Sequence, residues 1–201
     1  PHVDFQIPMM SLPGVFKTEI ETIPGEFPYM FVTENLRKKW AGRIEGNRLL
    51  KVGLVWKGSY KHQRNAWRSP GLAALKPLLD IDGIHWVSLQ KEDEMRDLRD
   101  VAMASRINSL GAQFQNFADT AAVITHLDLV ISPDTAVAHL AGALNQPVWI
   151  MLPYVAEWRW LMDRADSPWY PSMRLFRQHV RQDWSSTVSK IAYNLKLLVQ
   201  S

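Results

Sequence analysis

The fold is decided by residues 128–144, which read DLVISPDTAVAHLAGAL. The segment opens with a short apolar run typical of a buried strand, and a helical pattern follows at once. Ser132 can cap that helix, and Pro133 suits its first turn. A strand that leads directly into a helix is the repeating unit of α/β folds.

The same alternation continues on both sides of this segment. Strands are predicted over residues 50–56, 84–89, 112–115, 129–131, 147–151 and 173–176, and helices over 72–79, 92–104, 117–127, 135–144 and 184–199. This order predicts an α/β fold, a Rossmann-like parallel sheet with helices on both faces. Such sheets bind ligands beyond the carboxyl ends of their strands, where the strand order reverses.

The chain before residue 50 lacks this alternation of strands and helices. Residues 1–31 are interrupted by Pro8, Pro13, Pro24 and Pro28, which favour loops and short extended pieces. Thr33 is a plausible N-cap for a charged helix that ends near residue 45. We therefore expect an interdomain segment over 1–31, a linker helix over 32–49 and a ligand-binding domain over 50–201. Because the chain starts at Pro1 without an initiator Met, a fragment of a longer protein is expected.

Composition excludes several classes of protein. The chain has no Cys, so disulfides and thiolate chemistry are ruled out. No apolar run approaches the ~20 residues of a membrane span, and the start does not read as a secretory signal. The six His and the acidic residues show no metal-ligand spacing, so no metal is expected. Most of the nine Trp are expected to pack in the core.

The start of the helix after residue 131 has the features of a phosphate site. Backbone N–H groups at Ala136 and the positive end of the helix dipole would face the ligand crevice. Thr135 adds a hydroxyl, and His139 shares its face one turn later. Asp134 would repel phosphate unless it orients these donors. The alternative is a well-capped packing helix with a histidine satisfied by backbone groups.

The loop over residues 57–69 adds positive charge after the first strand of the domain. Its candidate ligand-binding residues are Lys57, Gly58, Ser59, Lys61, His62, Arg64 and Arg68. A diphosphate site needs cationic donors and a glycine at which the backbone can approach the ligand closely, and this loop has both. The alternative is a solvated basic loop. Neither a G-x-G-x-x-G nor a Walker motif is present, which disfavours hydride chemistry and P-loop hydrolysis.

Two further segments follow strands. Gln90 could contact a base or ribose edge and Lys91 a phosphate, or both could belong to an ordinary strand-to-helix turn. Aromatic residues over 154–170 could wall a base or sugar pocket, or pack the loop against the sheet.

Several of these runs resemble a known family. Residues 117–122, 127–132, 134–144 and 147–149 resemble the C-terminal domain of ADP-heptose:lipopolysaccharide heptosyltransferases, glycosyltransferase family 9. They also resemble bacterial proteins that join tetratricopeptide repeats to an O-GlcNAc-transferase-like GT-B module. Residues 52–58, 68–69, 86–91, 158–160 and 166–171 extend the match, which covers about residues 50–185 and, more weakly, residues 11–31.

The resemblance implies the C-terminal half of a GT-B fold, with the donor bound in this half and the acceptor in a preceding domain. Residues 1–31 would be a remnant of that acceptor domain. The motif at Asp134, Thr135 and His139 would line the donor diphosphate, helped by Lys61 and Arg64. Ala136 departs from the family, which often has Gly there.

The function expected from the resemblance is metal-independent transfer of a sugar from a nucleotide-diphospho-sugar to an acceptor hydroxyl. His139 is the catalytic candidate, as a stabiliser of the leaving diphosphate, and the general base would lie outside this chain. The acceptor could be a glycan, a lipid-linked glycan or a protein. No cofactor, nucleic acid or transmembrane segment is expected, and the expected location is the cytoplasm or the inner-membrane periphery. The alternatives are a nucleotide-sugar epimerase and a non-catalytic binding or scaffold module.

Overall fold

A computed structural model describes residues 2–44, 49–61, 65–91, 94–99 and 104–200. Its centre is a six-stranded sheet in the order β3-β2-β1-β4-β5-β6. The strands are β1 (Leu50–Leu54), β2 (Ile84–Ser88), β3 (Ile107–Ser109), β4 (Leu129–Pro133), β5 (Val148–Leu152) and β6 (Met173–Arg177). Every neighbouring pair is parallel. The predicted Rossmann-like fold is confirmed, and the order reverses between β1 and β4.

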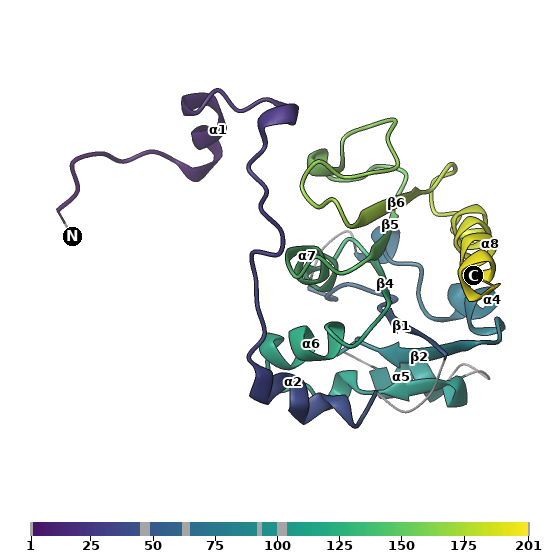
Figure 1. Cartoon of the computed structure of the whole chain (residues 1–201). Helices are drawn as coiled ribbons and strands as arrows, with labels where there is room; N and C mark the ends of the chain where they lie inside the picture. Colours follow the sequence, from purple (N-terminus) through teal and green to yellow (C-terminus); the bar gives the residue numbers. More distant parts are fainter. Residues whose placement is uncertain (1, 45–48, 62–64, 92–93, 100–103, 201) are drawn as a thin grey trace.

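Helices cover both faces of the sheet (Figure 1). One face carries α2 (Glu34–Ala41), α6 (Phe117–Ile124) and α7 (Ala136–Ala143), and the other carries α4 (Lys76–Leu79) and α8 (Ser185–Gln200). Each face has its own apolar core. All five residues of β4 are buried, as expected of a central parallel strand.

Shorter helices complete the described chain. They are α1 (Leu12–Val15), α3 (Asn65–Arg68), α5 (Glu94–Arg99) and the 3-10 turns η1 (Met9–Ser11), η2 (Ile20–Thr22), η3 (Ala73–Leu75), η4 (Ala104–Arg106), η5 (Gly111–Gln113) and η6 (Trp158–Trp160). No helix in these ranges is long and apolar enough to cross a membrane. The expectation for tryptophan is confirmed for six side chains, which are buried: Trp40, Trp56, Trp86, Trp149, Trp160 and Trp184.

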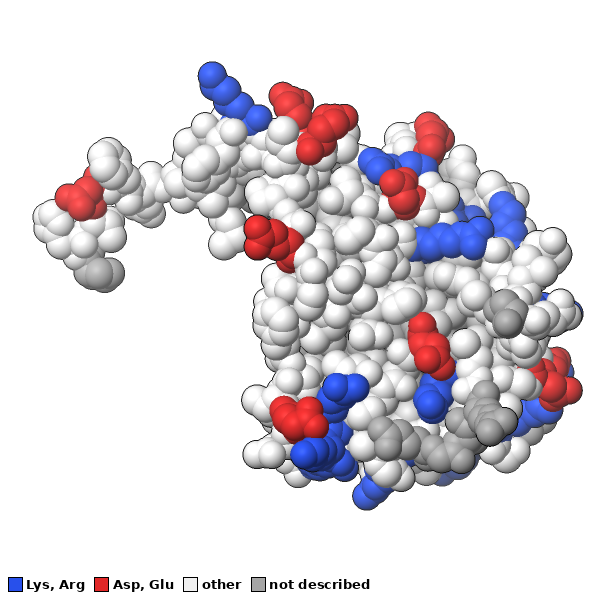
Figure 2. All heavy atoms as spheres, viewed as in Figure 1, with Lys and Arg blue, Asp and Glu red and all other residues white. Residues whose placement is uncertain are grey.

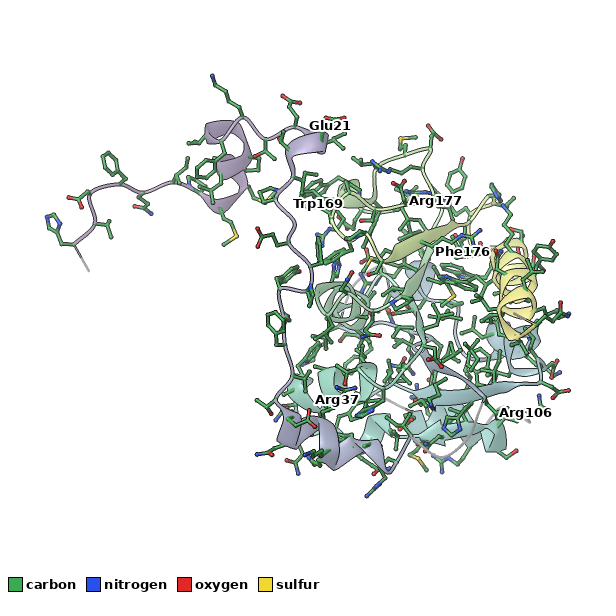
Figure 3. The ribbon with its side chains drawn as sticks, viewed as in Figure 1. Glu21, Arg37, Arg106, Trp169, Phe176 and Arg177 are labelled. Atoms are coloured by element: carbon green, nitrogen blue, oxygen red, sulfur yellow. The ribbon has the colours of Figure 1, made fainter. Side chains whose placement is uncertain are left out.

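The helix expected to act as a linker packs against the sheet domain. Asp119 on α6 accepts hydrogen bonds from Lys39 Nζ (2.8 Å) and Trp40 Nε1 (2.9 Å) on α2. The carbonyl of Arg37, labelled in Figure 3, lies 3.0 Å from His126 Nε2. Burial opposes ionisation of Asp119, but these two donors and the backbone N–H of Gln115 outweigh it and lower its pKa to about 2. A linker role for α2 stays a prediction.

The segment before α2 stands away from the sheet domain over much of its length (Figures 1 and 2). Its last part returns to the domain, where the N–H groups of Tyr29 and Met30 donate to the carbonyl of Ala143 (3.1 and 3.2 Å). The helical pieces are short, as the prolines predict.

The prediction of the third strand was wrong. β3 lies at Ile107–Ser109, and residues 111–113 form a 3-10 turn instead. The reason is a close approach to the end of β2. A Cβ at Gly111 would lie 1.9 Å from the carbonyl oxygen of Gln90, so a glycine is needed where the chain crosses that strand end.

The start of α7 also differs from expectation. Ser132 and Pro133 belong to β4, with Pro133 paired in register with Met151 of β5. The Ser132 hydroxyl is buried and donates to the carbonyl of Pro133. Thr135 therefore occupies the N-cap position that the sequence assigned to Ser132.

Candidate functional site

A cavity of about 350 Å³ opens where the strand order reverses. We call it the switch-point pocket. Its lining comes from the segments that follow β1, β2 and β4 and from the start of α6: Val55, Lys57, Gly58, Ser59, Arg68, Leu89, Gln90, Lys91, Asn116, Phe117, Thr120, Thr135, Ala136 and Val137. This is where open α/β sheets bind their ligands.

The start of α7 presents unused donors to this pocket. Thr135 makes no side-chain capping bond, because its hydroxyl pairs with Ser132 Oγ at 2.9 Å. The N–H groups of Ala138 and His139 donate to the carbonyl of Thr135. Those of Ala136 and Val137 make no hydrogen bond with any described residue. Two free N–H groups at the positive end of a helix form a site for an anion.

Basic side chains surround these donors. Lys57, Arg68 and Lys91 line the pocket, and its described lining contains no carboxylate. A Cβ at Gly58 would lie 2.7 Å from Arg68 Nη2, so the glycine lets the guanidinium lie against the backbone. Arg68 Nε is buried without a hydrogen-bond partner in the described chain. An anionic ligand would supply the acceptor that this buried donor requires.

Two of the predicted residues also hold the pocket wall together. Lys57 Nζ pairs with Asp97 Oδ2 at 2.6 Å, and Trp56 Nε1 donates to the same oxygen at 2.7 Å. The buried Gln90 accepts hydrogen bonds at Oε1 from the backbone N–H groups of Trp56 (3.3 Å) and Lys57 (3.1 Å). Gln90 thus joins the end of β2 to the chain leaving β1.

The basic loop is only partly described. Ser59 lines the pocket and accepts a hydrogen bond from the backbone N–H of Lys61 at 3.4 Å. Lys61 is exposed and is not a lining residue. His62 and Arg64 lie outside the described residues. The binding roles of all these side chains stay predictions.

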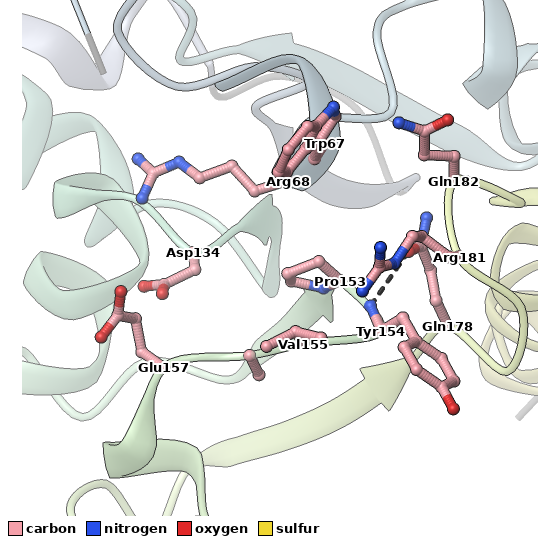
Figure 4. Close-up of a pocket in the computed structure, with 11 residues that line it drawn as sticks. Trp67, Arg68, Asp134, Pro153, Tyr154, Val155, Glu157, Gln178, Arg181 and Gln182 are labelled. Carbon is pink, nitrogen blue, oxygen red and sulfur yellow. Dashed lines mark hydrogen bonds between the residues drawn. The ribbon is translucent and has the colours of Figure 1, made fainter. Parts of the chain in front are cut away.

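A second cavity, of about 400 Å³, lies beyond β4 and β5 (Figure 4). We call it the β5 pocket, lined by Trp67, Arg68, Asp134, Pro153, Tyr154, Val155, Ala156, Glu157, Gln178, Arg181 and Gln182. Arg68 lines both cavities and therefore joins them. Figure 4 shows the carboxylates of Asp134 and Glu157 close to each other on one side of the cavity.

Asp134 is held by the residues behind it. Its Oδ1 lies 3.4 Å from His139 Nε2. Burial favours the neutral carboxyl, but the interactions with His139 and Trp160 and the charge of Arg68 outweigh it and lower the pKa of Asp134. The Trp160 indole N–H contributes to this shift although its geometry falls short of a hydrogen bond. Asp134 is therefore ionised at neutral pH.

His139 lies behind Asp134 and outside the lining of both cavities. Its Nδ1 is 3.0 Å from the Tyr170 hydroxyl, and its ring stacks on Trp160 with centroids 5.3 Å apart. Burial, followed by the hydrogen bond to Tyr29, raises the pKa of Tyr170, so the phenol stays protonated at neutral pH. The partners of His139 are side chains rather than the backbone groups considered above, and its role toward a diphosphate stays a prediction.

Sequence reasoning missed several lining residues. Three of them lie at the start of α6, the helix that follows β3: Asn116, Phe117 and Thr120. Because the third strand was misplaced, these residues were not recognised as lying at the edge of the sheet. Trp67 belongs to the short helix α3, and Arg181 and Gln182 lie on a loop, all three without a motif. No group of three or more His, Asp or Glu side chains in the described ranges could hold a metal ion.

Part of the chain resembles known protein sequences. Residues 85–152 match the sequence model of glycosyltransferase family 9 (heptosyltransferase). Protein FlbA of Caulobacter vibrioides is 29% identical over 150 residues, which is 73% of this chain and 25% of FlbA. The chain thus spans a quarter of that relative.

Two solved structures are similar. ADP-heptose lps heptosyltransferase II of E. coli matches 90% of this chain and 56% of its own, with a TM-score of 0.59 and 14% identity. A glycosyl transferase family 9 structure from Veillonella parvula matches 83% of this chain and 45% of its own, with a TM-score of 0.49 and 14% identity. The family match over residues 85–152 supports a glycosyltransferase domain, and the chain has the Rossmann-like fold of one half of a GT-B heptosyltransferase structure.

Proposed function

We propose that this chain is the donor-binding domain of a glycosyltransferase that acts on a nucleotide-diphospho-sugar without a metal ion. The observation that supports this most strongly is the uncapped start of α7. Its two free N–H groups, at Ala136 and Val137, share a pocket with Arg68 and Lys91. Backbone donors and cations fixed in one place are the means by which proteins bind a diphosphate.

The two cavities divide the donor between them. The diphosphate occupies the switch-point pocket, and the sugar occupies the β5 pocket, with Arg68 at the junction. Asp134 and Glu157 offer acceptors for sugar hydroxyls, while Trp67 and Tyr154 offer exposed aromatic surface. The nucleoside lies toward Phe117, whose half-exposed ring is available for stacking on a base.

The same groups favour departure of the nucleoside diphosphate. Negative charge grows on the diphosphate as the bond to the sugar breaks, and preorganised N–H groups and cations stabilise it. The ionised Asp134 lies on the sugar side, where it favours positive charge at the reacting carbon. His139 orients Asp134 from behind.

We place the general base and the residues that position the acceptor hydroxyl in another part of the full protein, because this chain spans 56% of heptosyltransferase II. Positioning of an acceptor contributes up to ~7–11 kcal/mol in favourable systems. We therefore expect this chain alone to hydrolyse donor at most. Clear sugar transfer to a defined acceptor by residues 1–201 would contradict the split site. Tetratricopeptide repeats and a cytoplasmic location stay predictions.

Calorimetry tests the proposal. Wild-type chain is titrated with a panel of nucleoside diphosphates and nucleotide-sugars in buffer containing EDTA, and we expect at least one to bind. Arg68→Gln should weaken binding by about 10- to 100-fold, the scale of hydrogen bonds to a charged group. Lys38→Gln, on the exposed face of α2, is the matched control and should bind as wild type. Binding that requires a divalent cation, or no binding at all, would contradict the proposal.

A further inference from the structure

A third cavity continues from the β5 pocket along the outer side of β6. Its volume is about 830 Å³, within the range of ligand sites. It shares Tyr154, Val155, Ala156 and Gln178 with the β5 pocket, so the two form one continuous surface. We call this cavity the β6 groove. A ligand longer than one sugar could lie in both.

Basic side chains dominate the described lining of the β6 groove. Arg164, Arg174, Arg177 and Lys190 line it, against one carboxylate, Asp163. Figure 2 shows Lys and Arg side chains gathered over β6 and α8. Arg164 is neutralised by two bonds to Asp166, at 2.8 and 2.6 Å. The other three cations leave the groove with an excess of positive charge.

Arg177 is partly buried and has no carboxylate bonded to it in the described chain. Its Nη2 donates to the carbonyl of Trp160 (2.5 Å) and its Nε to that of Arg164 (3.5 Å). Burial lowers its pKa, and the charge of Asp163 opposes this only in part. Figure 3 shows Arg177 and Phe176 on β6, and both residues line the groove. An anion here would stabilise a cation that is only partly compensated.

Arg174 and Lys190 are exposed but held in place. Arg174 Nη1 donates to Asn194 Oδ1 at 2.7 Å, and its guanidinium lies 5.0 Å from the ring centre of Phe176. Lys190 Nζ is hydrogen-bonded to His179 Nε2, and Asn194 Nδ2 donates to the carbonyl of Lys190. Cations fixed in this way lose little conformational entropy when an anion binds.

We propose that the β6 groove binds the anionic group, phosphate or carboxylate, of a saccharide acceptor that extends out of the β5 pocket. The acceptor part rests on the proposed function, because the β5 pocket then holds the transferred sugar and a molecule reaching past it is the acceptor. The anion-binding part rests on the groove alone.

Binding of small saccharides tests this directly. The probes are glucose 6-phosphate, glucuronate and neutral glucose, titrated by NMR into the full chain in the presence of excess nucleoside diphosphate, which competes for the switch-point pocket. We expect at least one anionic probe to bind and glucose to bind at least 10-fold more weakly. A preference for glucose 6-phosphate would identify a phosphorylated acceptor, and a preference for glucuronate an acidic sugar.

Substitutions in the β6 groove test whether the anionic probe binds there. The double substitution Arg174→Gln with Lys190→Gln should weaken anionic-probe binding by about 10-fold or more. The matched control, Lys38→Gln with Lys76→Gln, removes two positive charges elsewhere and should change affinity less than about 2-fold. Equal affinities in wild type and the groove variant, or equal losses in both variants, would overturn the proposal. Failure of wild type to bind any nucleotide contradicts the proposed function, whereas the comparison of variants still decides the groove.

Discussion

Two helices of eight residues begin at the same end of the sheet and differ in how their first turn is satisfied. α6 is closed by its own side chains. Asn116 Oδ1 accepts from the N–H groups of Ala118 (2.9 Å) and Asp119 (3.3 Å), and Asp119 Oδ2 accepts from that of Gln115 (3.0 Å). α7 has no side-chain cap, and its N–H groups at Ala136 and Val137 donate to no residue that the structure describes.

The difference distinguishes a helix start closed by side chains from one whose N–H groups are available to a ligand. At α6, the Asp119 carboxylate supplies the negative charge that a helix N-terminus favours. At α7, Ala138 stands in the position of Asp119, and the nearest carboxylate, Asp134, precedes the N-cap and interacts with His139 and Trp160. The positive end of α7 is therefore left for an external anion. We expect substitutions at α6 to change stability and substitutions at α7 to change affinity.

The largest expected effect is the loss of stability in Asp119→Ala. The variant leaves the buried Trp40 N–H without its acceptor and separates α2 from α6, so the free energy of unfolding should fall by about 2–4 kcal/mol. Urea denaturation measures this. Asp80→Ala, which removes an exposed i,i+4 pair with Lys76, is the control and should stay within about 0.5 kcal/mol of wild type. Nucleotide affinity per folded molecule should be unchanged. A large loss of affinity would contradict the expectation that substitutions at α6 change stability and not binding.

The same carboxylate predicts a pH dependence. The folded-state pKa of Asp119, about 2, is below its ordinary value near 4, so its stabilising effect is complete above about pH 4. The effect is lost as the pH falls from 4 toward 2. The difference in unfolding free energy between wild type and Asp119→Asn should therefore shrink over that range, and a constant difference would show that the ionised form is not what stabilises the fold.

Thr135→Asp should separate affinity from stability. Asp is at least as good an N-cap as Thr and favours the helix dipole, so the melting temperature should be equal or higher. The added carboxylate would repel a diphosphate, so nucleotide affinity should fall by about 10- to 100-fold, the scale of a lost charge-assisted bond. Thr135→Ser keeps the hydroxyl and serves as the control. If Thr135→Asp bound nucleotide as tightly as wild type, the phosphate could not lie at the start of α7.

A smaller effect is expected for His139→Ala. Because His139 lies behind Asp134 and acts on the sugar only through it, its loss should weaken binding of the intact nucleotide-sugar by about 3- to 10-fold, less than the loss of a direct bond to a charged group. Binding of the nucleoside diphosphate alone should change little. Comparing the two ligands by calorimetry checks this, with Tyr170→Phe testing the next residue in the chain of contacts. Equal losses for both ligands would instead place His139 on the diphosphate itself.

Most of the fold could be predicted from sequence, because buried parallel strands read as apolar runs between helical patterns. β3 could not, since Asn108 and Ser109 have weak strand preference and the nearby apolar Phe114 is buried outside any strand. The N-cap of α7 was placed too early, at Ser132, because Ser-Pro is a common helix signal, whereas here strand pairing extends through Pro133.

The candidate site was predictable in its position but not in its detail. The rule that ligands bind past the strand ends led to Arg68, Lys91, Thr135 and Ala136, all of which line the switch-point pocket. Residues of the β5 pocket such as Trp67, in the four-residue helix α3, and Arg181, in a loop, come from segments too short or too irregular to show a periodic pattern. The salt bridge between Lys57 and Asp97 is a tertiary contact, which the spacing of residues along the sequence does not reveal.

The central claim is that the free N–H groups of α7 bind the diphosphate without a metal ion. Backbone amide NMR of the wild-type chain, titrated in EDTA with the nucleoside diphosphate that binds most tightly, tests it most directly. The account predicts the largest shifts at the amides of Ala136 and Val137, and small shifts at Ala118 and Asp119 of α6. Shifts confined to other parts of the chain, or none at saturating nucleotide, would contradict it.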